Sequence, residues 1–417
     1  MCHQKGVKFV NPNPAARAGR ADSGWLKRVV LLSPMVLLGM APAALGPVLA
    51  EVQREFSGFP GSAYLVPMVL TLPSVCIALL SGLAGIMVDR LGRKTVLVFG
   101  LFLYGVAGVA PFFLTSLPAI LASRIFVGIA EACAMIAATT LIGDEYEGEE
   151  RERMLAYQIA VAALSAVTIA AASGVLGSFG WRYAILPHSL SLAVCCLAIA
   201  LIREPQRPTR AAASSARKPA EPFPWQSTLM AGGLMLMTSL FFFIMPVELA
   251  FILTNVGITS PEVIGLTLAG VTIGLAVGAM LYKALSRYNT RVHIALGFAI
   301  MAIGLAGVAG SRSHAVITGF AFLSEIGGGM MVPSLLAAAL QLFSFEHRGF
   351  GTGLVQSSNS LGQFACGVVV TGLAAATTSL TTALWILAGW AAVVSILAGL
   401  TLLRRPATAH APGLMGD

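Results

Sequence analysis

The sequence predicts an all-α membrane protein whose twelve transmembrane helices form two pseudo-symmetric six-helix bundles. Three observations lead to this prediction. The 417 residues have a mean hydropathy of +0.84, with 57% hydrophobic and only 11% charged residues. Twelve long apolar runs follow one another, and one polar stretch divides them into six and six. Because soluble domains carry about 25% charged residues, the composition excludes a soluble fold.

Each apolar run is long enough to cross a bilayer, which takes about 20 residues in a helix. Irregular backbone cannot face lipid, so we expect each run to be one complete span. Residues 1–28 contain no signal-peptide cleavage pattern, so the first span should be retained. The predicted spans are 29–50, 63–88, 95–115, 118–142, 154–178, 183–202, 228–253, 261–283, 292–311, 314–342, 352–377 and 382–403.

The polar stretch between the two groups is rich in Pro, Ala, Ser and charge, which is typical of a flexible linker. Two six-helix halves joined in this way are expected in a transporter whose halves rock about a site at the bilayer midplane. The predicted organisation is a cytoplasmic tail, an N-terminal bundle, a cytoplasmic linker, a C-terminal bundle and a second cytoplasmic tail, at 1–28, 29–202, 203–227, 228–403 and 404–417.

Lys and Arg are concentrated on one side of the predicted spans. The segments on the side of the N-terminus hold 22 of the 26, and the opposite loops hold three. Basic residues are retained on the cytoplasmic side, so we expect both termini in the cytoplasm and a plasma membrane location, the inner membrane in a bacterium. The net charge of +8 is divided among seven short segments, and nucleic-acid binding, which needs a continuous basic stripe, is excluded.

The linkers after the second span of each half resemble one another. The first is GIMVDRLGRK, residues 85–94, and the second is GAMLYKALSR, residues 278–287. Both begin with Gly and carry a basic residue at the equivalent position, Arg90 in one and Lys283 in the other. Tyr282 stands where the first copy has Asp89. This pair supports two halves of related structure, of which only the first keeps the acid.

The stretch GIMVDRLGRK resembles the G-x-x-x-D-R-x-G-R-K signature between the second and third helices of the major facilitator superfamily. Further matches in the expected order are RIFVG (124–128), GEERER (148–153), GWRYAI (180–185) and RGFGTGL (348–354). The resemblance implies alternating-access transport of a small-molecule substrate across a lipid bilayer. The chain has no nucleotide-binding or zinc-protease motif, so we expect no enzyme, no ATP-driven pump, no metal and no cofactor.

In that family the signature holds the cytoplasmic gate shut, and the resemblance implies the same latch here. Gly85 would allow helices to approach closely, and Asp89 would bind the positive N-terminal end of the eleventh helix near residues 351–353. Arg93 would reach Asp144 or, as a second choice, Glu145. The alternative is a plain tight turn with Gly and basic residues. The predicted gating residues are Gly85, Asp89, Arg90, Gly92, Arg93, Lys94 and Asp144.

Four charged residues lie away from the ends of the predicted spans, where charge is costly and usually faces a cavity or a partner. Arg124 either faces a cavity or a partner, or it extends its charged group to the outer membrane interface. Glu131 lies seven residues further on the same helical face, near the midplane. Glu131 and Glu325 either exchange a proton as access alternates or are permanently protonated structural residues. Glu248 takes part in transport or lies in interfacial water.

Smaller and amide side chains complete the candidate cavity. Gly128 follows Arg124 in the fourth span, and Asn359 and Gln363 present amides on one face of the eleventh. The amides would bind substrate or join helices. In the tenth span, three glycines at 327–329 and Pro333 predict either a bent helix or close packing.

These residues predict proton-coupled efflux of a small organic compound by an antiporter, with Glu131 and Glu325 as proton carriers. The proton gradient would be the energy source, and we expect a monomer. One alternative is proton-linked uptake of a metabolite. The alternative from another class is a non-transporting membrane sensor on the same scaffold.

Overall fold

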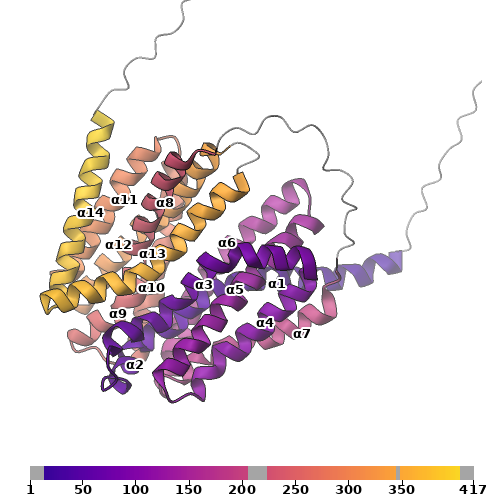
Figure 1. The fold of residues 1–417 in the computed structure, drawn as a ribbon, viewed down its shortest axis with the longest axis horizontal. Coiled ribbons are helices and arrows are strands. Elements are labelled where there is room, and N and C mark those ends of the chain that lie inside the picture. The colour runs from indigo at the N-terminus through magenta and orange to yellow at the C-terminus, as the bar shows by residue number, and fades with distance from the viewer. Residues whose placement is uncertain (1–13, 205–222, 344–347, 404–417) are drawn as a thin grey trace, which may run out of the picture.

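The computed structural model describes residues 14–204, 223–343 and 348–403. Within these ranges the chain forms helices and no strand. Residues 205–222 of the predicted linker, together with 1–13 and 404–417 of the predicted tails, lie outside the described residues. Figure 1 shows two groups of helices, one from each half of the sequence, lying side by side.

The N-terminal half contains seven α-helices and three short 3-10 helices, in an order that matches the first six predicted spans. The 3-10 helices η1, η2 and η3 extend α-helices of this half into complete spans. Their bounds are α1 Pro14–Leu45, η1 Gly46–Val48, α2 Leu49–Glu55, α3 Ser62–Leu91, α4 Arg93–Val109, η2 Ala110–Phe112, α5 Leu117–Glu145, α6 Gly148–Gly177, η3 Tyr183–Ser189 and α7 Leu190–Leu201.

The C-terminal half also contains seven α-helices. Two of them, α8 and α9, are separated only by Phe243 and together make one span. The bounds are α8 Trp225–Phe242, α9 Ile244–Asn255, α10 Pro261–Ala284, α11 Thr290–Ala309, α12 His314–Leu342, α13 Arg348–Thr377 and α14 Leu380–Leu403.

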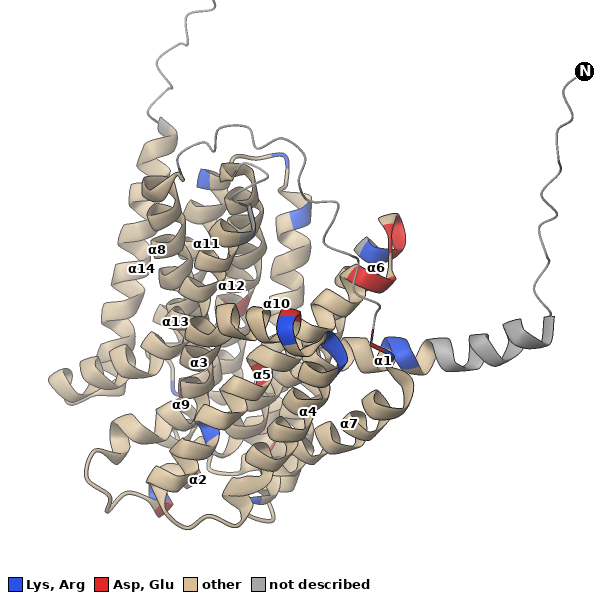
Figure 2. Cartoon of the chain, turned by 45° about the vertical axis from the view of Figure 1, so that its right-hand side comes forward, with Lys and Arg blue, Asp and Glu red and all other residues tan. Residues whose placement is uncertain are grey.

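Eleven of these helical segments are long and apolar enough to cross a membrane, and a bent pair supplies a twelfth. The twelve coincide with the twelve predicted spans, which confirms the predicted all-α architecture. Figure 2 shows the Lys, Arg, Asp and Glu positions mainly near helix ends, with ribbon of other residues between them. This distribution leaves the apolar side chains in the middle of each span free to face lipid or pack.

Two spans are broken where the sequence predicted continuous helices. The first consists of Trp25–Leu37 and Gly39–Glu55, which meet at 54°. Pro42 lacks the N–H that would bond the carbonyl four residues earlier, and this defect accounts for the bend. Pro246 has the same effect on the carbonyl of Phe242, where α8 ends and α9 begins.

The tenth span, α12, is continuous through Pro333. Its three glycines lie at helix contacts: Gly327 faces Met301 of α11, Gly328 faces Phe242 of α8, and Gly329 faces Leu275 of α10. Close packing, one of the two alternatives predicted, is therefore the one that the structure contains. The interrupted helices are the first and seventh spans instead.

The two halves meet along α3 with α13 and along α6 with α10. One close contact joins Gly174 of α6 and Gly265 of α10, where a Cβ added to Gly265 would lie 2.6 Å from Gly174 Cα. This contact lies on the face opposite the chain termini, three residues before the end of α6. On the same side, Gly46 of η1 packs against Leu268 of α10. The halves are thus closed against one another on that face.

Candidate functional site

The residues of the gating signature surround the turn between α3 and α4. Gly92 occupies this turn with φ of +98°, a conformation that residues with a Cβ rarely adopt. The carboxylate of Glu204, at the end of the sixth span, accepts hydrogen bonds from the backbone N–H groups of Arg93 (2.7 Å) and Lys94 (2.9 Å). Glu204 therefore caps α4, whose first N–H groups have no partner within the helix.

The side chains of Arg93 and Lys94 bind within the N-terminal half. Arg93 Nε lies 2.7 Å from Asp144 Oδ2, the first of the two acids suggested from the sequence. The second acid, Glu145, pairs instead with Lys27 of α1 at 2.8 Å. Lys94 Nζ donates to the carbonyl of Ile199 in α7 at 2.8 Å. These bonds tie α1, α4, α5 and α7 together on the face that carries the termini.

The predicted contacts of Asp89 and Gly85 with the C-terminal half are not made among the described residues. Asp89 is exposed, and its carboxylate has no hydrogen-bond or ion-pair partner among the described residues. A Cβ on Gly85 would meet no atom within 4 Å, so no helix approaches closely there. Arg90 is exposed at the end of α3. Asp89 and Gly85 thus make no latch contact among the described residues, while the halves touch on the opposite face.

Arg124 is completely buried but does not line a cavity. Its Nη2 donates to the carbonyls of Ala107 and Gly108, each at 3.0 Å, and its Nε to Ser123 Oγ at 3.3 Å. These two carbonyls belong to the last turn of α4, where no helical N–H is available. A guanidinium also complements the negative end of a helix. Arg124 thus caps the C-terminal end of α4.

Tyr104 of α4 interacts electrostatically with both Arg124 and Glu131. Its hydroxyl donates to the carbonyl of Leu37 at 3.0 Å, directly beside the bend in the first span. Its ring stacks on His188, with centroids 5.4 Å apart. His188 Nδ1 is bonded to the carbonyl of Ile185, as expected for a structural histidine. This buried group connects the fourth span to the bend of the first.

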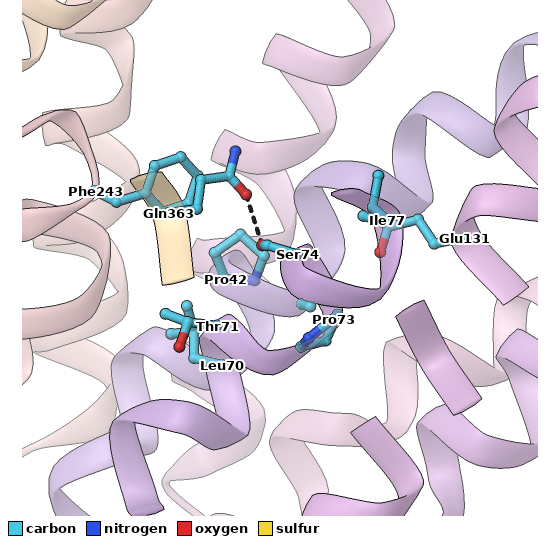
Figure 3. Close-up of a pocket in the computed structure, with 10 residues that line it drawn as sticks. Pro42, Leu70, Thr71, Pro73, Ser74, Ile77, Glu131, Phe243 and Gln363 are labelled. Carbon is cyan, nitrogen blue, oxygen red and sulfur yellow. Dashed lines mark hydrogen bonds between the residues drawn. The ribbon is translucent and has the colours of Figure 1, made fainter. Parts of the chain in front are cut away.

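A small cavity of about 20 Å³ lies between the halves near the middle of the spans, enough for about one water molecule. Figure 3 places Gln363 and Phe243 of the C-terminal half on one side, Glu131 on the other, and Ser74 of α3 between them. Ser74 Oγ donates to Gln363 Oε1 at 2.7 Å, so this bond joins the two halves. Pro42, whose position bends the first span, also lines the cavity.

Glu131 is 2% exposed, and its Oε1 has no hydrogen-bond partner among the described residues. Unpartnered buried polar atoms are rare in folded proteins and call for an explanation. The group lies on the cavity wall, between the two halves of the molecule. A carboxyl in such a place can bind a proton or a ligand when the cavity opens.

The remaining candidates lie elsewhere in the core. Glu325 is 3% exposed and faces Gly274 of α10, and Glu248 is 4% exposed in α9, so Glu248 does not lie in interfacial water. Gly128 packs tightly against Pro73 of α3. Asn359 is half-buried one turn before Gln363. None of these four lines the cavity. Among the described residues, no group of His, Cys, Asp and Glu could hold a metal ion.

Family comparison agrees with this architecture over nearly the whole chain. Residues 32–258 and 228–416 match the sequence model of the Major Facilitator Superfamily. The chain belongs to the Major Facilitator Superfamily. It is therefore an integral, multi-pass membrane transporter and not an enzyme, as the sequence predicted.

Two curated superfamily members match parts of the chain. A stretch of 155 residues is 32% identical to the 4-hydroxybenzoate transporter PcaK of Pseudomonas aeruginosa, covering 35% of this chain and 31% of that protein. A stretch of 133 residues is 30% identical to the bacillibactin exporter of Bacillus subtilis, covering 30% of this chain and 32% of that protein. The aligned stretches thus span about a third of each relative.

Solved superfamily structures share the fold over most of the chain. A D-xylose–proton symporter superposes with a TM-score of 0.72 at 14% identity, covering 90% of this chain and 97% of that one. A bacterial homolog of the human lysosomal transporter Spinster, in an inward-facing and occupied conformation, gives 0.69 at 16% identity, with the same coverage. At these identities the likeness concerns the fold alone.

Proposed function

We propose that this transporter exports a small organic compound in exchange for protons. The observation that carries the proposal is the position of Glu131: a buried carboxyl with an unpartnered oxygen, on the wall of a cavity between two halves that must rock. Burial favours the neutral carboxyl, and entry of water or a cation favours the ionised one. Glu131 would therefore load and release a proton as the cavity opens to each side.

Alternating access assigns a role to the contacts between the halves. In the described conformation they meet on the face opposite the termini, through Gly174 and Gly265. Opening that face requires these contacts to loosen while the other face closes. Asp89 would then reach the N-terminal end of α13 and hold the closed face, as the family signature implies. The cavity at Glu131 would be exposed first to one side and then to the other.

Glu325 is the second proposed proton carrier. It is buried, and its Oε1 lacks a described hydrogen-bond partner. Its Cβ faces Gly274, and because glycine has no side chain, α10 and α12 lie in close contact there. Rearrangement of these two helices would change the surroundings of the carboxyl. We further propose that both termini face the cytoplasm of a cell whose plasma membrane holds the protein, a bacterial inner membrane included, and that the protein acts as a monomer.

Transport can be tested with purified protein in liposomes that contain a pH-sensitive dye. An imposed proton gradient should drive accumulation or release of substrate, and substrate added to one side should move protons to the other. Proton efflux on addition of external substrate indicates exchange, as proposed, and proton influx indicates uptake with protons. If no compound of a broad panel produced a flux of substrate or of protons, the result would favour the alternative of a non-transporting membrane sensor.

The same assay tests the role of Glu131. Glu131→Gln keeps the shape of the side chain but cannot release a proton, so proton-coupled flux should be lost while exchange of substrate for substrate persists. Glu262→Gln is the matched control, because Glu262 is an exposed residue in the first turn of α10. Coupled flux that survives Glu131→Gln would exclude Glu131 as the carrier.

A further inference from the structure

The chemistry of the cavity wall also indicates which kind of substrate it accepts. We propose that the cavity, once it opens to one side, binds organic cations, protonated amines above all, and that the substrate's positive group and a proton compete for the carboxylate of Glu131. This inference rests on the proposed transport function and names the substrate class of the same site. It excludes carboxylates and other organic anions as preferred substrates.

The first argument is the charge of the lining residues. Glu131 is the one ionisable group among the described residues of the wall. The other polar groups are neutral: the hydroxyls of Thr71 and Ser74 and the amide of Gln363. Phe243 adds an aromatic ring, whose face attracts cations. A positive ligand therefore finds a carboxylate and a ring, and a negative ligand finds no opposite charge.

The second argument is where the buried bases lie. Arg124 donates through Nη2 to the two carbonyls that end α4, and His188 is bonded to Ile185 and stacked on Tyr104, while Arg124 Nη1 and His188 Nε2 have no described hydrogen-bond partner. His293, the third buried base of the described residues, lies between the Leu285 carbonyl and Ser334 near the termini side. None lines the cavity. A buried anion would thus remain unpaired beside an acid, which is strongly unfavourable.

The surroundings of Glu131 contain few other groups that could control its proton. From α4, Tyr104 interacts with it electrostatically, and Arg124 on its own helix interacts with the same tyrosine. From α3, the thiol of Cys76 lies one helix contact away, at Gly128. The membrane-depth parts of α1 and α13 contain no charged residue. The nearest full positive charge is therefore Arg124, about 10 Å along the helix and already bonded to backbone.

Competition at one carboxylate couples the two fluxes directly. A single carboxylate that accepts a proton has no charge left for an ammonium group, and one that holds an ammonium group excludes the proton. On one side of the membrane a proton binds Glu131 as the cation leaves, and on the other side a cation binds as that proton leaves. Atoms and charge balance, because one positive group replaces another. The shared site thus gives exchange rather than joint uptake.

The test compares matched probes that differ in charge alone. One set is tyramine, tyrosol and 4-hydroxyphenylacetate, which carry the same phenol and end in an ammonium, a hydroxyl or a carboxylate. Two further sets replace the phenol with a straight alkyl chain and with a naphthyl ring. Binding to the purified protein is measured by calorimetry at two pH values on either side of neutrality, and proton flux is measured in liposomes with the same compounds.

In each set that binds, the ammonium member should bind about tenfold or more tightly than the hydroxyl member, as charge-assisted hydrogen bonds imply. The carboxylate member should bind least. Affinity for the ammonium member should fall as the pH falls, because protons then occupy Glu131. Glu131→Gln should remove both the preference and the pH dependence, while Glu262→Gln keeps them.

Three outcomes would overturn the inference. Tighter binding of a carboxylate or hydroxyl member, with proton flux on its addition, would refute the substrate class while supporting proton-coupled transport. No binding by any ammonium member refutes the substrate class as well, and proton flux with other compounds then decides separately on the transport function. A preference for ammonium that persists in Glu131→Gln would place the cation site elsewhere.

Discussion

The two halves of the molecule share six spans each but bury their polar groups differently. In the N-terminal half, Arg124, Tyr104 and His188 form one connected group that ends a helix and reaches the bend of the first span. In the C-terminal half, Glu248 and Glu325 each have an oxygen with no described hydrogen-bond partner. The N-terminal half also has such an oxygen, on Glu131, so the halves differ in the connected group around Arg124 and not in having isolated carboxyls.

The helix contacts at the centre of each half differ in a related way. In the N-terminal half a glycine of the fourth span, Gly128, faces Cys76 of the second. In the C-terminal half a glutamate of the tenth span, Glu325, faces Gly274 of the eighth. The glycine of the contact thus belongs to the fourth span in one half and to the eighth span in the other. Related backbones can therefore keep a similar separation while placing a carboxyl in only one of the two contacts.

The largest effect is expected from Arg124→Ala, which removes the donors that satisfy Ala107 and Gly108. Two buried carbonyls then lose a charged partner, and the variant should be destabilised by about 3–5 kcal/mol or fail to accumulate folded. Thermal unfolding in detergent measures this. Arg54→Ala is the control, because Arg54 is exposed and its ion pair with Glu51 is 3.7 Å long. Equal stability of Arg124→Ala and the parent would contradict the capping role.

Replacing Gly128 or Gly274, the glycines of the two central helix contacts, should cost less. A Cβ at Gly128 would lie 2.6 Å from the Pro73 carbonyl, and one at Gly274 would lie 2.9 Å from Glu325 Cβ. Alanine at either position should destabilise by about 1–3 kcal/mol through overpacking. Gly270→Ala, where no atom lies within 4 Å, should be neutral or stabilising. If only one of the two contacts proved sensitive, the correspondence between the halves would be lost.

Tyr104→Phe should have a smaller effect, since it removes only the hydroxyl that binds Leu37. A net loss of about 1 kcal/mol is expected for one hydrogen bond. Tyr282→Phe is the control in the C-terminal half, because no described hydrogen bond involves the Tyr282 hydroxyl. Spin-label distances across the bend of the first span should broaden in Tyr104→Phe alone. An unchanged distance distribution would show that the bend does not depend on this bond.

The smallest effect on stability is expected for Asp89→Asn, whose side chain is exposed and unpaired among the described residues. The free energy of unfolding should stay within about 0.5 kcal/mol of the parent. The conformational balance should nevertheless shift, because the variant weakens the latch that closes the termini side. Accessibility of single cysteines on that face should rise. If accessibility and transport were both unchanged, the latch would have no role.

Sequence patterns predicted the spans because the bilayer imposes one length and one polarity on every crossing. Arg93 and Asp144 could be paired for a related reason: charges at the ends of adjacent spans have few partners within reach. The bends at Pro42 and Pro246 were not predicted. Proline is common within membrane helices, and only the packing around it decides whether the helix bends there. For the same reason, the glycines at 327–329 predicted a bend and packing equally.

The roles of individual buried residues were less predictable. A charged residue within a span indicates that it has a partner but does not identify that partner. Arg124 binds backbone carbonyls, and because every residue has one, the sequence could not show which carbonyls these are. Glu204 lies 111 positions after Arg93, so no local spacing connects it with the start of α4. The signal that the sequence did contain was an isolated acidic residue, Glu204, at the end of the sixth span. Ser74 was overlooked because a hydroxyl in a span usually bonds its own helix.

The contact of Gly174 with Gly265 makes α6 a lever. The helix has 30 residues, and the contact lies three from one end, so about 39 Å of helix extends beyond it at 1.5 Å per residue. A rotation of about 10° there would swing the far end by roughly 7 Å. Because neither glycine carries a side chain, the two backbones can roll without interlocking, and a small movement at one membrane face becomes a large opening at the other.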